Sequence, residues 1–82
     1  MNVVVKLFGP QALLAGRRKY SVEMASGAPT PAKLRERLCE LEPGLAPTLS
    51  VSRFAINHAL ASDDTEIRPG DEVALIGMLS GG

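Results

Sequence analysis

TPAKLRERLCELEPG, residues 30–44, predicts one amphipathic helix in the middle of the chain, with a defined start and end. Thr30 offers a side-chain oxygen as an N-cap, and Pro31 suits the first helical position, where its missing N–H is no loss. The pair Pro43-Gly44 ends the helix. Leucines at intervals of four and three form one apolar stripe that needs a layer to pack against: Leu34, Leu38 and Leu41.

Two strands are expected before this helix. Residues 2–8 are rich in β-branched and apolar side chains, and residues 19–24 alternate between apolar and polar side chains. Gly9-Pro10 ends the first strand, and residues 12–15 are expected to make a helical turn that closes at Gly16. The two strands should form an antiparallel hairpin. The side chains expected to point inward are Val3, Val5, Leu7, Tyr20, Val22 and Met24.

Two more strands are expected after the helix, at residues 54–60 and 72–76, with turns at residues 63–65 and 69–71 between them. The order strand, strand, helix, strand, strand is that of a β-grasp domain, an α+β fold in which a mixed sheet wraps around one main helix. The last strand is expected to pair centrally, beside the first. We therefore expect a β-grasp domain over residues 1–77 and an extended, flexible tail over residues 78–82.

Length and charge narrow the class of function. A chain of 82 residues forms one small domain with little room for an internal active site, so a carrier or partner is expected rather than a self-contained enzyme. Nine basic and nine acidic residues cancel, which argues against binding to nucleic acid or anionic membranes. The basic run at residues 17–19 is expected to be a solvated turn. No membrane span or signal peptide is apparent, and a cytoplasmic protein is expected.

The residues that could carry chemistry inside the chain are few. Cys39 is the single cysteine, which suggests a reducing compartment. It lies off the leucine stripe and is expected at the boundary between core and surface. His58 has no partners at a spacing that implies a triad or metal site, and it is expected to be a strand residue. The aspartates are expected to be turn formers: Asp63, Asp64 and Asp71. No bound cofactor and no metal site are expected.

The chain ends in Gly81-Gly82, and this C-terminus is a possible chemical handle. Without Cβ atoms, two glycines can lie extended in a narrow channel and present the terminal carboxylate to another protein. The alternative is a frayed end with small residues and no function.

Residues 54–82, FAINHALASDDTEIRPGDEVALIGMLSGG, resemble the C-terminal half of molybdopterin synthase small subunits, the MoaD-like sulfur carriers of the ubiquitin-like MoaD/ThiS superfamily. The resemblance covers essentially the whole chain, although Gly77-Met78-Leu79 replaces the Pro-Pro-Val usual in the family. The residues that carry it are Ala55–Asn57, Asp64-Thr65, Pro69–Ala74, Ser80–Gly82 and, more loosely, Val5–Phe8, Leu34–Leu41 and Pro43–Leu45.

The resemblance implies that Gly82, preceded by Gly81, is the reactive end of a sulfur carrier that is not catalytic alone. A ubiquitin-activating-type adenylyltransferase (MoeB-like) would use ATP to adenylate the Gly82 carboxylate, and a sulfur donor would convert the acyl-adenylate to a thiocarboxylate. The thiocarboxylate would give its sulfur to cyclic pyranopterin monophosphate in molybdenum cofactor biosynthesis. Its partner there would be the MoaE-like large subunit, in a heterotetramer of two small and two large subunits.

By matching position, the family's hydrophobic contact patch falls on Phe8, Leu60 and Ile76, and the partners would also hold the tail. Strand alternation independently turns Phe8 and Ile76 away from the core, whereas alternation from Phe54 would turn Leu60 inward. Isolated surface hydrophobic residues are the alternative explanation. The tail residues expected to bind partners are Met78, Leu79 and Ser80.

Other functions stay open at this stage. The chain could carry sulfur for thiamine-thiazole synthesis or for cysteine or homocysteine synthesis. It could be a ubiquitin-like modifier that joins its C-terminus to lysines of target proteins, or a non-covalent interaction module in which the diglycine has no role.

Overall fold

The computed structural model describes residues 1–25, 27 and 29–77, and in this part of the chain five strands form one sheet beside three α-helices and a 3₁₀ turn. The elements are β1 (Asn2–Lys6), α1 (Gly9–Ala15), β2 (Lys19–Glu23), α2 (Pro31–Leu41), η1 (Pro43–Leu45), α3 (Ala46–Leu49), β3 (Ser52–Ile56), β4 (Ala59–Leu60) and β5 (Val73–Gly77).

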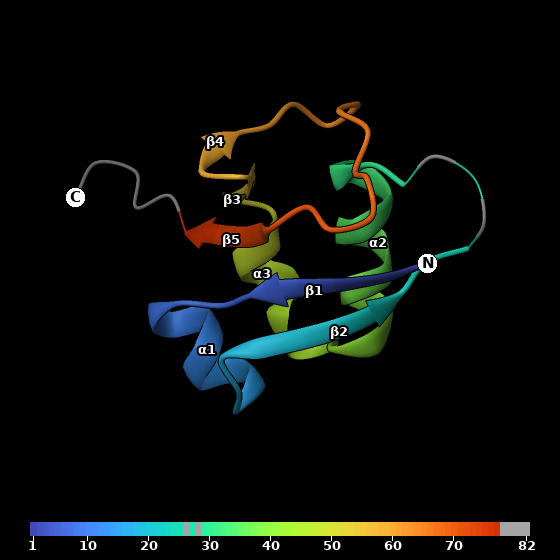
Figure 1. The fold of residues 1–82 in the computed structure, drawn as a ribbon. Helices are drawn as coiled ribbons and strands as arrows, with labels where there is room; N and C mark the ends of the chain where they lie inside the picture. Colours follow the sequence, from blue (N-terminus) through green and yellow to red (C-terminus); the bar gives the residue numbers. More distant parts are fainter. Residues whose placement is uncertain (26, 28, 78–82) are drawn as a thin grey trace.

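The strands lie in the order β2-β1-β5-β3-β4, so the last strand pairs centrally as predicted. β5 runs parallel to β1, with Val5 opposite Val73, and antiparallel to β3. β1 and β2 are antiparallel neighbours, as expected. Figure 1 shows the helices α2 and α3 behind this sheet and α1 at the end where β1 finishes. The mixed sheet around one main helix confirms the predicted β-grasp fold.

The main helix forms as the sequence predicts. The Thr30 hydroxyl accepts a hydrogen bond from the Lys33 amide at 3.3 Å and caps the first turn, which satisfies one of its free N–H groups. Leu34 and Leu38 are fully buried against the sheet. Leu41, however, is 37% exposed, because the helix ends there and the chain turns away into η1.

The core lies between this helix and the inner face of the sheet. Alternation along β1 is as predicted, since Val3, Val5 and Leu7 are buried. The unpredicted η1 and α3 close the core after Leu41. The other buried hydrophobic residues of the core are Val22, Met24, Leu34, Leu38, Leu45, Leu49, Phe54, Ile67, Val73 and Leu75.

The connection between β1 and β2 is more helical than the predicted turn at residues 12–15. β1 ends at Lys6, and Phe8 is the extended N-cap residue of a helix that begins at Gly9. Pro10 lies in the first turn, where a missing N–H costs no hydrogen bond, so Gly9-Pro10 starts a helix as well as ending a strand. Gly16 ends α1 in the left-handed conformation, with φ of 70°.

The predicted strand at residues 54–60 is wrong in its second half. Asn57 and His58 both have positive φ, 52° and 71°, and make a two-residue turn between the antiparallel strands β3 and β4. His58 is therefore an exposed turn residue, and the predicted strand position for it was wrong. The turns predicted at residues 63–65 and 69–71 are both present, at residues 63–64 and 69–70.

A search of residues 1–25, 27 and 29–77 found no helix with the length and apolar character that a bilayer crossing requires.

Candidate functional site

Three hydrophobic residues that the sequence predicted as a patch lie around one hollow on the outer face of the sheet. Phe8 and Leu60 are each 53% exposed, and Ile76 is half-buried. The hollow has a volume of about 360 Å³. Its lining residues are Lys6, Phe8, Ala55, His58, Leu60, Glu72, Ala74 and Ile76. The three residues therefore form one surface, and their role in binding a partner stays a prediction.

Leu60 reaches this surface because of the hairpin turn. Alternation along an unbroken strand from Phe54 predicted that Leu60 would point inward, and this was wrong. The turn at Asn57-His58 reverses the chain and pairs Leu60 with Ala55 on the adjacent strand. Paired residues share one face of a sheet, and Ala55 lies next to core residue Phe54, so both Ala55 and Leu60 face outward.

Charged groups border the hollow on one side. The Lys6 ammonium donates a hydrogen bond to Glu72 Oε1 at 2.7 Å, and His58 Nε2 lies 2.8 Å from Glu72 Oε2. The bond from Lys6 holds the pKa of Glu72 below its ordinary value, with smaller contributions from the charges of Lys6 and His58. The apolar hollow is thus edged by a carboxylate that stays ionised near neutral pH and by two groups able to donate hydrogen bonds.

The turn that carries His58 is fixed to the start of β5. The side-chain amide of Asn57 donates a hydrogen bond to Asp71 Oδ1 at 3.0 Å, and the backbone amide of Glu72 donates one to Asn57 Oδ1 at 2.9 Å. Asp71 also accepts a hydrogen bond from the backbone amide of Arg68. This bond is the main reason that the pKa of Asp71 is lowered, and the bond from Asn57 is the second. Asp71 acts as a turn former, as predicted, and helps to hold one wall of the hollow.

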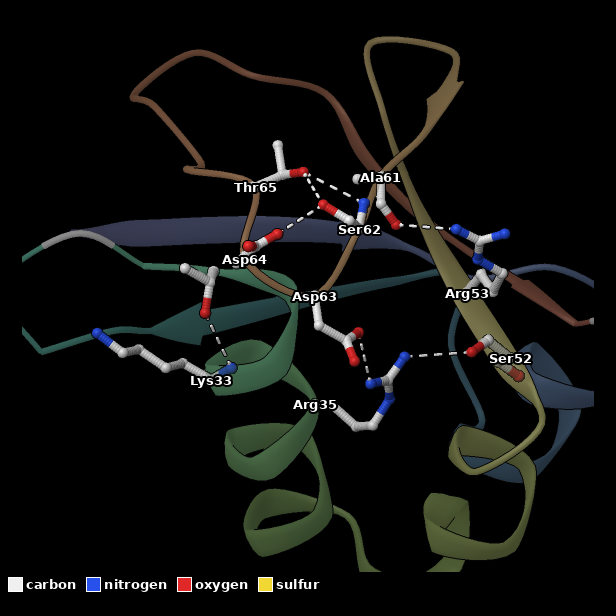
Figure 2. Close-up of polar contacts among 10 residues, drawn as sticks. Lys33, Arg35, Ser52, Arg53, Ala61, Ser62, Asp63, Asp64 and Thr65 are labelled. Atoms are coloured by element: carbon white, nitrogen blue, oxygen red, sulfur yellow. Dashed lines mark hydrogen bonds and ion pairs between the residues drawn. The ribbon is translucent and has the colours of Figure 1, made fainter.

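Figure 2 shows a second set of polar contacts, which ties the loop after β4 to α2. Arg35 pairs with Asp63 at 3.1 Å, donates to the Ser52 carbonyl at 3.2 Å, and lies over the Phe54 ring at 5.6 Å from its centroid. The Ser62 hydroxyl donates to Asp64 Oδ1 at 2.7 Å within the loop. These aspartates hold the loop in place, as the sequence predicted.

A second hollow, of about 350 Å³, lies where β5 ends and was not predicted from the sequence. Phe8 and Ile76 line both hollows, so the two surfaces are continuous. The residues lining the second hollow are Phe8, Gly9, Pro10, Gln11, Thr48, Val51, Ile76 and Gly77. Sequence reasoning missed Gln11 and Val51 because it did not predict helix α3 or the first turn of α1, which place them there.

The tail residues predicted to contact partners and to carry the chemistry lie outside the described residues: Met78, Leu79, Ser80, Gly81 and Gly82. The described chain ends at Gly77, which pairs with Ser52 at the edge of the second hollow. Cys39 on α2 is half-buried against the core, at the boundary between core and surface as predicted. Among the described residues, no group of three or more His, Cys, Asp or Glu side chains could hold a metal ion.

Solved structures with the same fold include an archaeal modifier protein and subunits of molybdopterin-converting factors from an archaeon and a bacterium. Small archaeal modifier protein 1 (SAMP1) from Haloferax volcanii is 26% identical, with both chains covered in full and a TM-score of 0.83. A putative molybdopterin converting factor subunit 1 from Pyrococcus furiosus is 23% identical over 96% of this chain and 99% of that one, with a TM-score of 0.82, a likeness of fold alone.

A chain in the complex of subunits 1 and 2 of molybdopterin-converting factor from Helicobacter pylori 26695 is 25% identical, with both chains covered in full and a TM-score of 0.68. A comparison with curated protein sequences gave no significant match. The model of the ThiS family matches residues 5–82, nearly the whole length, including both hollows and the diglycine end. With this match and the ubiquitin-like β-grasp fold, the chain belongs to the ThiS family.

Proposed function

We propose that this chain is the sulfur carrier subunit of a molybdopterin synthase, with the Gly82 carboxylate as the group that carries sulfur. The observation that carries the proposal is the placement of the hollow formed by Phe8, Leu60 and Ile76. It lies on β5, the strand that leads through Gly77 into the diglycine end. A partner that holds this face is therefore held close to the reactive C-terminus.

The chemistry begins with activation of a carboxylate that resists nucleophiles. A carboxylate oxygen of Gly82 attacks the α-phosphorus of ATP, bound by the adenylyltransferase, and pyrophosphate leaves. A hydrosulfide ion then attacks the acyl carbon, the bond to AMP breaks, and a thiocarboxylate forms with release of AMP and one proton. Neither step involves oxidation or reduction. The adenylyltransferase supplies the site for ATP, since the carrier contributes only its C-terminus.

The acceptor in this proposal is cyclic pyranopterin monophosphate, bound by a MoaE-like large subunit. Support comes from the Helicobacter pylori relative, which was solved as a complex of subunits 1 and 2 of molybdopterin-converting factor. The thiocarboxylate sulfur attacks an acceptor carbon and displaces an oxygen substituent there, which joins carrier and acceptor as a thioester. Water then cleaves the acyl–sulfur bond, so the sulfur stays on the acceptor and the carrier regains its carboxylate. Two small and two large subunits form the proposed assembly.

Intact mass spectrometry tests the carrier role. The chain with its native C-terminus is incubated with a MoeB-like adenylyltransferase, ATP and hydrosulfide. The expected result is a mass increase equal to the exchange of one oxygen for sulfur, located at Gly82 by fragmentation. The matched control carries one alanine after Gly82 and should not react. An unchanged mass, with an enzyme that activates its own known carrier, would refute the proposal.

A second candidate is a ubiquitin-like modifier, favoured by the 26% identity to small archaeal modifier protein 1 over the full chain. In that case the activated Gly82 carbonyl is attacked by a lysine amine of a target protein, AMP leaves, and an isopeptide bond forms. Lysine side chains joined by an isopeptide bond to the C-terminal peptide that ends in Gly82, detected by mass spectrometry in cells with the native chain and lost when Gly82 is deleted, would identify this role.

A further inference from the structure

Two buried polar side chains meet at the end of β5. Among the described residues, Gln11 and Ser52 are the polar residues that are buried, with 5% and 4% of their surface exposed. The Gln11 amide donates a hydrogen bond to Ser52 Oγ at 3.0 Å, and Ser52 Oγ donates to the Thr48 carbonyl at 2.6 Å. The pair therefore links α1 to β3 and to the end of α3.

This buried pair lies directly against Gly77. Ser52 is the cross-strand partner of Gly77 in the β3–β5 ladder. A Cβ atom added to Gly77 would lie 2.7 Å from Gln11 Nε2, 3.1 Å from Oε1 and 3.3 Å from Cδ. Real Cβ atoms do not approach that closely, so the Gln11 amide occupies the space that a side chain at position 77 needs. Glycine at this position is explained by the neighbouring amide.

A buried amide is an unusual choice for packing alone. A leucine has a similar volume and needs no hydrogen-bond partner, whereas a buried amide loses its hydration and must be bonded. What the amide adds is direction, because the bond to Ser52 fixes the orientation of its planar head group. Ser52 is itself held by Thr48, and its carbonyl is held by Arg35, as Figure 2 shows for the latter.

We propose that Gln11 is a positioning residue that fixes the backbone at Gly77 and thereby the direction in which the C-terminal tail leaves the sheet. The inference rests on the proposed carrier function and adds to it. A partner that has docked on the outer face must find the Gly82 carboxylate in its active site. Because Gly77 is already fixed, fewer conformations are lost when the Gly82 carboxylate enters the active site of the partner.

The expected effect of losing the Gln11 contact on kcat follows from the backbone conformational freedom of one residue. Fixing the backbone of one residue costs enough conformational entropy to reduce an equilibrium about fivefold to thirtyfold. Loss of the Gln11 contact should therefore lower the kcat of adenylation by about that factor. The KM for the carrier should stay within about twofold, because binding through Phe8, Leu60 and Ile76 does not involve Gln11.

The contact itself is tested without any enzyme by a double-mutant cycle in urea. Gly77→Ala should lower the unfolding midpoint in the native background, because the new Cβ displaces the Gln11 amide from Ser52. In the Gln11→Ala background, where the space is free, the same change should have a much smaller effect. Equal effects of Gly77→Ala in the two backgrounds would show that the amide does not hold Gly77.

The positioning role is tested with Gln11→Leu, which keeps the volume and leaves the bond from Ser52 to Thr48 intact. Pyrophosphate release is measured with the MoeB-like adenylyltransferase at a temperature where both chains are folded. We expect kcat to fall and KM to be unchanged, together with a shift of the Gly77 amide resonance in NMR spectra. Leu13→Ala, on the exposed side of α1, is the control and should match the native chain.

The outcomes separate the two proposals. Equal kcat values for the native chain and Gln11→Leu would overturn the positioning role and leave the carrier function standing. A merely structural role would lower the melting temperature of Gln11→Leu without lowering kcat below melting. Absence of pyrophosphate release from the native chain, with an active enzyme, would instead refute the carrier function and with it the role of Gln11.

Discussion

Replacing Phe8 with alanine should weaken binding to the large subunit far more than it disturbs the isolated domain's fold. A phenylalanine side chain buries about 150–250 Å² when it is fully covered. Phe8 is 53% exposed, so a partner can cover roughly half of this area, about 80–130 Å². At 25 cal/mol per Å², the lost contact is worth about 2–3 kcal/mol. The dissociation constant should therefore rise about 30- to 150-fold.

Isothermal titration of the MoaE-like large subunit with the native and variant chains measures this effect. The matched control is Leu13→Ala, because Leu13 is 84% exposed and apolar but lines neither hollow. Substitutions at such exposed positions change free energies by less than about 0.5 kcal/mol, so the control should bind within about twofold of the native chain. Circular dichroism at the titration temperature shows whether each variant is folded.

Equal affinities for Phe8→Ala and the native chain would remove Phe8 from the binding surface. Equal losses for Phe8→Ala and Leu13→Ala would mean that binding depends on general surface hydrophobicity or on α1, and would also refute the reasoning. Native protein that does not bind the large subunit at all would refute the choice of partner.

Two further predictions concern the contacts around the hollow and the loop behind it. Because the folded-state pKa of Glu72 is depressed by Lys6, its contribution to stability is complete above about pH 4.5 and is lost as the pH falls through the folded value. Melting temperatures of Glu72→Gln should thus fall less on acidification than those of the native chain; parallel curves would contradict this. Arg35→Ala should cost about 1–3 kcal/mol in urea unfolding, because the Ser52 carbonyl loses its charged donor. Asp63→Asn, at the 70% exposed end of the pair, should cost less than about 1 kcal/mol, and equal costs would rule out this ranking.

The sequence predicted those parts of the fold that local rules determine. Alternation in β1 and the Thr30 cap follow from strand period and capping chemistry. The strand order is not local, and it was expected from the β-grasp fold that the order of elements along the chain suggested. The predicted apolar stripe of the helix is confirmed for Leu34 and Leu38, which lie within the helix and pack against the sheet. It was wrong for Leu41, because the end of a helix is set by what the next segment does, and η1 and α3 carry few periodic residues.

Residues of the candidate site could be predicted from strand alternation only where no unpredicted turn interrupts the strand. Phe8 and Ile76 were assigned to the outer face by alternation alone, and the structure agrees. Leu60 required the Asn57-His58 turn, whose only sequence sign was an asparagine at a position that tolerates positive φ. Gln11 gave no sign at all, since a single glutamine on a short amphipathic segment is ordinary and its partner Ser52 lies far away in sequence.

The arrangement of β5 supports the carrier role proposed for this small domain. Within this strand, Val73 and Leu75 are buried in the core, while Ala74 and Ile76 line the hollow on the outer face. The strand is paired on both sides, with β1 and β3, so its position is fixed by the most cooperative part of the fold.

Five residues follow Gly77, and a fully extended chain of that length spans at most about 18 Å. Any active site that receives the Gly82 carboxylate must therefore lie within that distance of Gly77. In the proposed mechanism, an enzyme or subunit built around such a site lies close to the surface next to Gly77, where the two hollows meet at Phe8 and Ile76. The short reach of the tail therefore supports this face as the docking surface for the chemistry proposed at Gly82.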